Sequence, residues 1–240
     1  MKWWMYILLI GFPLIGGLIG FYTNIQKQNQ LKILLSFAGA YLLSVVLFHL
    51  IPHLYTEFNV VSGILILSGF FFQVYLEKFS RGVEHGHLHI HQQSSKSNYI
   101  PYEILISLSL HSFMEGMPLG SGLLENSNGQ LSFLFGIVSH EMPAAFAMVS
   151  ILKAAKLSNS KLLLFVVVYS SMSTTGVVMS SLLKDSVPHS MFEYLMAFVV
   201  GTFLHIATTI LFESSENHKF NMVKVLAMLA GIGLAALVSL

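Results

Sequence analysis

The chain has 240 residues, of which 55% are hydrophobic and only 10% are charged, and its formal net charge is +1. Soluble domains are usually about 25% charged, so this composition argues against a soluble domain and predicts a membrane protein. The absence of cysteine excludes disulfide bonds and thiolate metal sites. The near-neutral charge gives no indication of a nucleic-acid partner.

Eight stretches are apolar enough, at about 20 helical residues each, to cross a bilayer. In chain order they cover residues 3–23, 31–54, 60–77, 100–124, 130–152, 161–183, 191–212 and 221–240. Their polarity does not alternate as it does in barrel strands. The predicted fold class is therefore all-α: a polytopic membrane protein with eight transmembrane helices in a single domain over residues 1–240. The first stretch lacks a small-residue cleavage site, so we expect a retained helix and not a signal peptide.

Lysine and arginine residues are distributed unequally between the two sides of these helices. Of the twelve, only Lys2 and Lys184 fall on one side. The other ten are Lys27, Lys32, Lys78, Arg81, Lys96, Lys153, Lys156, Lys161, Lys219 and Lys224. Cytoplasmic loops are enriched in Lys and Arg. We therefore expect both termini outside the cytoplasm, in the plasma or inner membrane of a cell.

The loop at about residues 78–99 is the long one, and the same charge rule places it in the cytoplasm. It contains the sequence HGHLHIH, which puts His85, His87, His89 and His91 at alternate positions. Histidine-rich tracts commonly bind metal weakly, so we expect metal contact in this loop. The alternative is a solvated linker that happens to be rich in histidine.

Two carboxylates lie near the midpoints of predicted membrane helices. Glu115 is close to the middle of 100–124, and Glu141 is close to the middle of 130–152. A charge at that depth costs on the order of 2.5–3.5 kcal/mol on insertion scales, and intramembrane acids indicate a functional site by default. A charged partner or a water-filled path must offset the cost.

Two histidines accompany these carboxylates. His111 and Glu115 are four residues apart, so they share one face of a helix. His140 and Glu141 are adjacent, about 100° apart, and flank one sector of their helix. We expect all four side chains to converge from neighbouring helices on a divalent cation. Nitrogen and oxygen ligands without sulfur suit Zn²⁺, with Fe²⁺ and Mn²⁺ also plausible.

A proline follows each carboxylate at short range. Pro118 and Pro143 each lack a backbone N–H and are expected to kink their helices beside the site. An alternative is that each His–Glu pair is only a hydrogen bond between helices. The sequence HEMPA does not fit a zincin helix, because Ala144 stands where the second histidine is required.

The motifs HSFMEG and HEMP resemble the two signatures of the ZIP (Zrt/Irt-like) family of metal transporters. The stretches SFAGAYLLSVVLFHLIPH and GTFLHIATTILFE are similar to the family's second and seventh helices. The resemblance implies a ZIP-like eight-helix bundle with a metal pathway between the second, fourth, fifth and seventh helices. It implies a primary transport site of His111, Glu115, His140 and Glu141. Ser112 stands where Asn is common and would be a weak oxygen donor.

Further histidines lie on the pathway that the resemblance implies. His49 and His53, near the outer end of the second helix, could form an entry funnel. They could equally be interfacial histidines beside a helix-ending proline. His205, deep in the seventh helix, could be an exit ligand or a buried hydrogen-bonded histidine.

Two positions depart from the pattern of binuclear relatives. Ala144 and Ser173 stand where many of those relatives carry glutamate, so we expect one metal and not two.

Together these features predict a secondary transporter, and not an enzyme, that moves a divalent metal ion into the cytoplasm. Zn²⁺ is the expected substrate, and Fe²⁺, Mn²⁺ and Cd²⁺ are the alternatives. The chain has no nucleotide-binding motif, so transport must run down an ion gradient or by exchange. The rival interpretations are an intramembrane metal-dependent hydrolase and a metal sensor without flux. The sequence leaves open whether the chain forms a homodimer.

Overall fold

The computed structural model describes residues 1–23, 28–55, 59–80, 82–83, 100–124, 128–213 and 221–239. In this part of the chain the regular structure is helical and includes no strand, as the all-α prediction requires. Its elements are α1 (Trp3–Tyr22), α2 (Gln28–Val45), η2 (Val46–Leu50), α3 (Ile51–Tyr55), α4 (Val60–Ser80), α5 (Ile100–Gly120), α6 (Asn128–Ala154), α7 (Asn159–Leu183), α8 (His189–Glu213) and α9 (Met222–Ser239).

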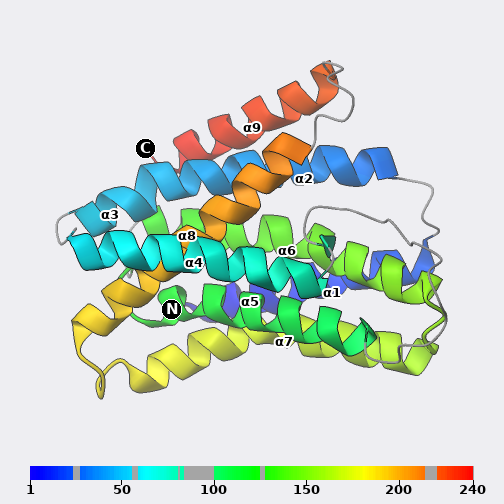
Figure 1. Cartoon of the computed structure of the whole chain (residues 1–240), viewed down its shortest axis with the longest axis horizontal. Helices are drawn as coiled ribbons and strands as arrows, with labels where there is room; N and C mark the ends of the chain where they lie inside the picture. Colours follow the sequence, from blue (N-terminus) through cyan, green and yellow to red (C-terminus); the bar gives the residue numbers. More distant parts are fainter. Residues whose placement is uncertain are drawn as a thin grey trace.

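Since α2, η2 and α3 follow one another without a break, the described helices form eight rods, the predicted number (Figure 1). Six of these rods are long and apolar enough to cross a membrane: α1, α2–α3, α4, α6, α7 and α8. The described α9 is shorter, and α5 is absent from the six although it has 21 residues. Its polar residues Glu103, His111 and Glu115 lower its hydropathy. The prediction of eight spans is thus confirmed for six.

The second predicted segment is not a uniform α-helix. Its turn Val46–Leu50 is a π-helix and contains His49. A π turn accommodates one extra residue, and such turns are frequent at functional sites. The predicted span over 31–54 is confirmed as a continuous helical segment, Gln30–Leu54, that contains this π turn.

The rods associate in two groups of four (Figure 1). In one group α1 packs mainly on α6 and α5 on α7, and in the other α4 packs on α8 and α2 on α9. The groups meet chiefly where α2 contacts α6 and where α4 contacts α5. The start of α1 and the end of α9 lie toward the same end of the bundle (Figure 1).

Glycines bring the backbones of paired helices into contact. A Cβ on Gly116 of α5 would overlap the carbonyl oxygen of Ser173 in α7. A Cβ on Gly176 of α7 would likewise overlap the carbonyl oxygen of Phe113 in α5. Small residues at helix interfaces allow this close approach in membranes. The contact also fixes the rotation of α5, and with it the direction of Glu115.

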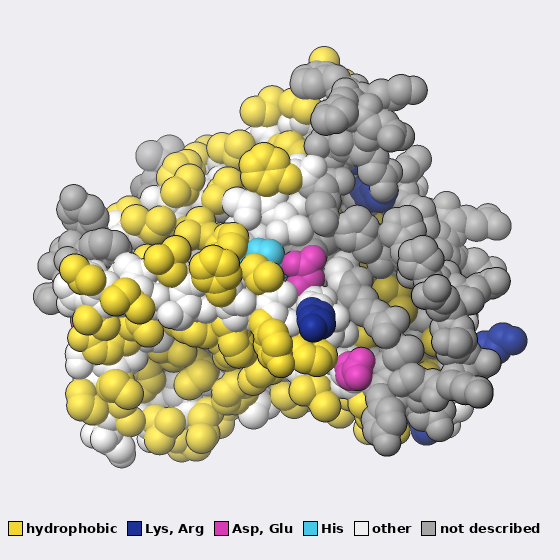
Figure 2. Space-filling model, in the orientation of Figure 1, with side chains coloured by type: hydrophobic (Ala, Val, Ile, Leu, Met, Phe, Trp, Pro, Cys, Tyr) yellow, Lys and Arg dark blue, Asp and Glu magenta, His cyan; other side chains and the backbone are white. Residues whose placement is uncertain are grey.

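The outer surface of the bundle is apolar. Among the described residues on the face that Figure 2 shows, hydrophobic side chains predominate. Among the exposed large hydrophobic residues, Leu67 and Phe71 lie on α4, and Leu226 and Leu229 lie on α9. Such a surface would cause aggregation in water, whereas a bilayer solvates it. The surface therefore agrees with the membrane protein that the composition predicts.

Candidate metal site

The site begins with one helical turn of α5. The i, i+4 spacing places His111 and Glu115 on the same face, and His111 Nε2 lies 2.8 Å from Glu115 Oε1. Both side chains are buried, and the Glu115 side chain has no exposed area. The first element of the predicted site, one shared face for these two residues, has the expected geometry.

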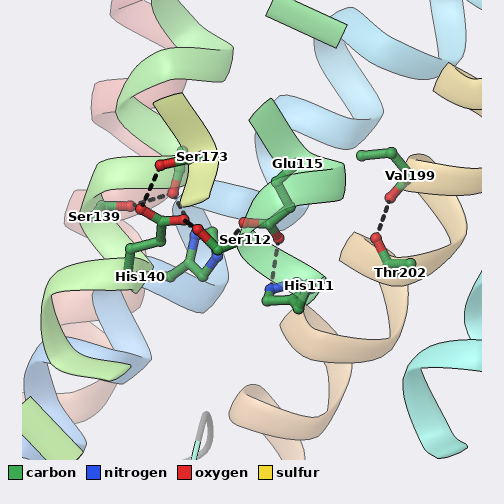
Figure 3. Close-up of polar contacts among 10 residues, drawn as sticks. His111, Ser112, Glu115, Ser139, His140, Ser173, Val199 and Thr202 are labelled. Carbon is green, nitrogen blue, oxygen red and sulfur yellow. Dashed lines mark hydrogen bonds and ion pairs between the residues drawn. The ribbon is translucent and has the colours of Figure 1, made fainter. Parts of the chain in front are cut away.

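The second histidine comes from α6. His140 Nε2 lies 2.9 Å from Glu115 Oε2, so each oxygen of this carboxylate faces one imidazole (Figure 3). His140 Nδ1 is 2.7 Å from the carbonyl oxygen of Gly136. Because a carbonyl oxygen can only accept, Nδ1 carries the proton and donates it. This bond orients the ring and leaves Nε2 as the atom directed at Glu115.

One ligand atom from each of His111, Glu115 and His140 lies within 4.8 Å of the other two. The centres of the two imidazole rings are 5.8 Å apart. Each oxygen of Glu115 thus lies within ion-pair distance of one imidazole, and the three ligand groups converge in an arrangement suited to a shared cation.

Glu141 does not belong to this group of three. Its Oε1 accepts a hydrogen bond of 2.5 Å from Ser112 on α5, and its Oε2 accepts one of 3.2 Å from Ser173 on α7 (Figure 3). All three side chains are buried. The structure thus brings together three of the four predicted ligands and holds the fourth, in the same region, between two hydroxyl groups.

Two of these contacts were not foreseen from the sequence. Ser112 was expected to be a weak oxygen donor to a metal, but here it donates a hydrogen bond to Glu141. Ser173 was singled out only as a departure from binuclear relatives, and it is the second partner of Glu141. A hydroxyl group in the middle of an apolar helix needs a hydrogen-bond partner. This feature of the sequence could have pointed to Ser173. Both α5 and α6 continue through Pro118 and Pro143, so the predicted kinks stay a prediction.

His205 of α8 has a different partner. Its Nε2 lies 2.7 Å from Oε2 of Glu77 on α4, and its ring contacts Phe70 edge-on at 5.0 Å. The structure therefore presents the buried, hydrogen-bonded histidine that was one of the two alternatives. This contact joins α4 to α8 and lies outside the three-residue group.

The remaining predicted histidines are not part of the group either. His49 is half-buried in η2, and His53 is exposed in α3. The four histidines of the loop, His85, His87, His89 and His91, lie outside the described residues. The predictions for entry and for loop binding therefore stay predictions.

Comparison with known proteins identifies the kind of chain that carries this site. A family model described as ZIP zinc transporter matches residues 80–239, which include the whole three-residue group. Protein zntD of Dictyostelium discoideum is 32% identical over 172 residues, 67% of this chain and 25% of that protein. Zinc transporter foi of Drosophila melanogaster is 26% identical over 155 residues, 63% of this chain and 22% of its own length.

A shorter relative, zinc transporter ZIP9 of Micropogonias undulatus, is 24% identical over 163 residues, 65% of this chain and 52% of the relative. The chain therefore spans about a quarter of the length of the first two relatives and about half of this one. The similarity lies in the part that holds the buried His–Glu group, since the family model begins at residue 80.

Proposed function

This chain belongs to the ZIP zinc transporter family, and we propose that it moves a divalent metal ion across a membrane through the site between α5 and α6. Zn²⁺ is the first candidate, because the matching family model and two of the relatives are named zinc transporters. Fe²⁺, Mn²⁺ and Cd²⁺ remain the alternatives, since nitrogen and oxygen ligands overlap widely in affinity for these ions. The family is one of transporters and not of enzymes.

The convergence of His111, His140 and Glu115 carries this proposal. Their ligand atoms all lie within 4.8 Å of one another, in a buried part of an apolar bundle. A buried carboxylate is costly unless a cation balances it. A divalent ion would take one oxygen of Glu115 and both Nε2 atoms, so the metal and the carboxylate would share one desolvation cost.

Glu141 is the proposed second carboxylate of the same site. A dication bound by two neutral imidazoles and one carboxylate keeps one positive charge, which a second nearby carboxylate would balance. Glu141 is adjacent in sequence to His140, and in the structure Ser112 and Ser173 hold its oxygens. We propose that the carboxylate leaves these hydroxyl groups when the ion binds, and that the site takes one ion.

The direction of transport is proposed to be into the cytoplasm. Ten of the twelve Lys and Arg residues lie on the side that would be cytoplasmic. The histidine tract of the long loop is on this side too, where it could receive the ion. The protein would act in the plasma or inner membrane with both termini outside the cytoplasm, either alone or as a homodimer.

The experiment that tests this function is metal uptake by vesicles reconstituted with the purified chain. We expect Zn²⁺ to accumulate and uptake to be faster at about pH 7.5 than at about pH 5.5, because imidazole and carboxylate ligands must be deprotonated to bind metal. A panel of Fe²⁺, Mn²⁺ and Cd²⁺ measured alongside would rank the substrates. Binding of Zn²⁺ without flux of any of these ions would show a sensor in place of a transporter.

The role of Glu141 can be tested by removing the two hydroxyl groups. In the double variant Ser112→Ala, Ser173→Ala, the carboxylate loses both donors in the metal-free state. Hydrogen bonds to charged groups contribute roughly 1.5–3 kcal/mol each. If metal binding releases Glu141 from the serines, the double variant should therefore bind Zn²⁺ roughly tenfold or more tightly than the wild type, as measured by titration calorimetry.

The matched control for that variant is Ser171→Ala, which removes a hydroxyl group of α7 that donates to the carbonyl oxygen of Val168 in its own helix. This change should leave the dissociation constant for Zn²⁺ unaltered. Equal affinity in the wild type and the double variant would mean that Glu141 of the wild type keeps its hydrogen bonds to Ser112 and Ser173 when Zn²⁺ binds. Glu141 would then not be a ligand.

A further inference from the structure

A cavity of about 210 Å³ lies where α1, α2 and α6 meet. Ile19 of α1, Leu31 and Leu34 of α2, and Pro143 and Phe146 of α6 line it, so its walls are largely apolar. The volume is several times the roughly 30 Å³ that one water molecule occupies in the liquid, and apolar walls favour an apolar guest. The cavity therefore suits a hydrocarbon occupant.

The cavity opens onto the outer surface of the bundle. Two of the residues that line it are exposed, Ile19 by 42% and Leu34 by 39%. Both are apolar and lie on helices long and apolar enough to cross a membrane. In a bilayer, acyl chains are the medium that contacts this opening.

One end of the cavity is polar and faces a positive charge. Thr23, directly after α1, and Gln30, at the start of α2, line that end. The ammonium group of Lys153 donates to the carbonyl oxygen of Phe21 at 2.7 Å and to that of Thr23 at 3.2 Å. A lysine has three N–H donors, and among the residues that the structure describes two of them go to these carbonyl oxygens, so the third could serve a further acceptor.

Other lysines strengthen the positive charge at this end of the bundle. Lys32 lies in the first turns of α2, and Lys156 lies two residues after the end of α6. Basic residues at a membrane surface attract anionic lipid headgroups, at about 1 kcal/mol per residue in general. The cavity thus combines an apolar chamber, an opening to lipid and a cationic rim, which are the three parts of a phospholipid site.

We propose that this cavity binds one anionic phospholipid of the surrounding bilayer. One acyl chain lies between α1, α2 and α6, and the phosphate group is held by Lys153 beside Thr23 and Gln30. The acyl chain of the lipid contacts both groups of helices, since α1 and α6 belong to one group and α2 belongs to the other. It also lies against Pro143, two residues beyond Glu141, so the lipid supports the helix that carries His140.

The test compares lipids that differ in headgroup charge alone. The purified full chain is stripped of lipid in detergent, supplied with phosphatidylglycerol or with phosphatidylcholine of the same acyl chains, and analysed by native mass spectrometry. We expect one tightly retained phosphatidylglycerol per chain and a preference of about tenfold over phosphatidylcholine, as one charge-assisted hydrogen bond would provide. Equal retention of the two lipids by the wild type would overturn the proposal, whatever the variants do.

Two variants locate the lipid. Leu34→Trp fills the chamber and should reduce phosphatidylglycerol retention about tenfold. Lys153→Gln can still donate to the carbonyl groups but lacks the charge, so it should abolish the preference for the anionic headgroup. If the lipid binds elsewhere, both variants will behave as wild type, and that result would also overturn the proposal.

Matched controls exist on α7. Leu164 is 58% exposed and does not line the cavity, and Lys161 is at the start of the same helix. Leu164→Trp and Lys161→Gln repeat the two chemical changes on another surface, so both should retain phosphatidylglycerol as wild type does. A loss as large in the controls as in the cavity variants would contradict a site at this cavity.

Discussion

Replacing Glu115 by glutamine is expected to reduce Zn²⁺ uptake by roughly 100-fold or more while the protein still inserts and folds. Glu115 is the carboxylate that both imidazoles face, at 2.8 Å and 2.9 Å. Glutamine keeps the shape of the side chain but removes the negative charge that offsets the ion. Changes in groups that merely support a ligand already cost about 10–100-fold in metal affinity or activity, so the loss of the central ligand should cost at least as much.

Vesicle uptake and calorimetric Zn²⁺ binding measure this effect separately, so a transport defect can be distinguished from a binding defect. The matched control is Glu103→Gln, which removes a carboxylate from the first turn of the same helix. Control and wild type should transport alike. A folded Glu115→Gln variant that transports Zn²⁺ at the wild-type rate would refute the proposed site.

The largest expected effect on stability comes from Gly116. A valine there would put its Cβ onto the carbonyl oxygen of Ser173, which is backbone and cannot rotate away. Overpacking usually costs about 1–3 kcal/mol, and a clash with a rigid helix lies at or above the top of that range. We expect Gly116→Val to lose most of its folded protein, as seen by size-exclusion chromatography in detergent and by a lowered thermal midpoint.

Gly233 provides the comparison, because a Cβ added to this residue of α9 meets no atom within 4 Å. Gly233→Val makes the same change at an open surface and should leave the midpoint nearly unchanged. A stable, monodisperse Gly116→Val protein would mean that α5 and α7 are not held together as the structure describes. In that case the contact of Gly116 with α7 would not fix the direction of the Glu115 side chain.

Much of the architecture was predictable from the sequence because hydropathy is a local property. A helix that faces lipid must be apolar over about 20 residues, so all eight rods are evident in the sequence as largely apolar runs. The rod α5 is nevertheless not among the six that are long and apolar enough to cross a membrane. The helix α5 has lower hydropathy because it carries His111 and Glu115, and its motif reveals it more clearly than its hydropathy does.

The spacing of residues on one helix was equally predictable. Four residues on an α-helix return to the same face, so the contact of His111 with Glu115 follows from the sequence. The same rule separates His140 from Glu141 by about 100°. The residues that face His140 and Glu141 belong to neighbouring helices. The spacing along α6 does not predict which residues those are.

Tertiary structure alone decided those partners. Glycine contacts such as that of Gly116 with α7 set the distance and rotation of each pair of helices. In the resulting arrangement His140 faces Glu115, while Glu141 faces the hydroxyl groups of Ser112 and Ser173. The sequence by itself determined which side chains lie near the middle of their helices, because position along a helix follows from residue count. Which of them meet depends on backbone approach between helices far apart in the chain, and only the folded bundle provides it.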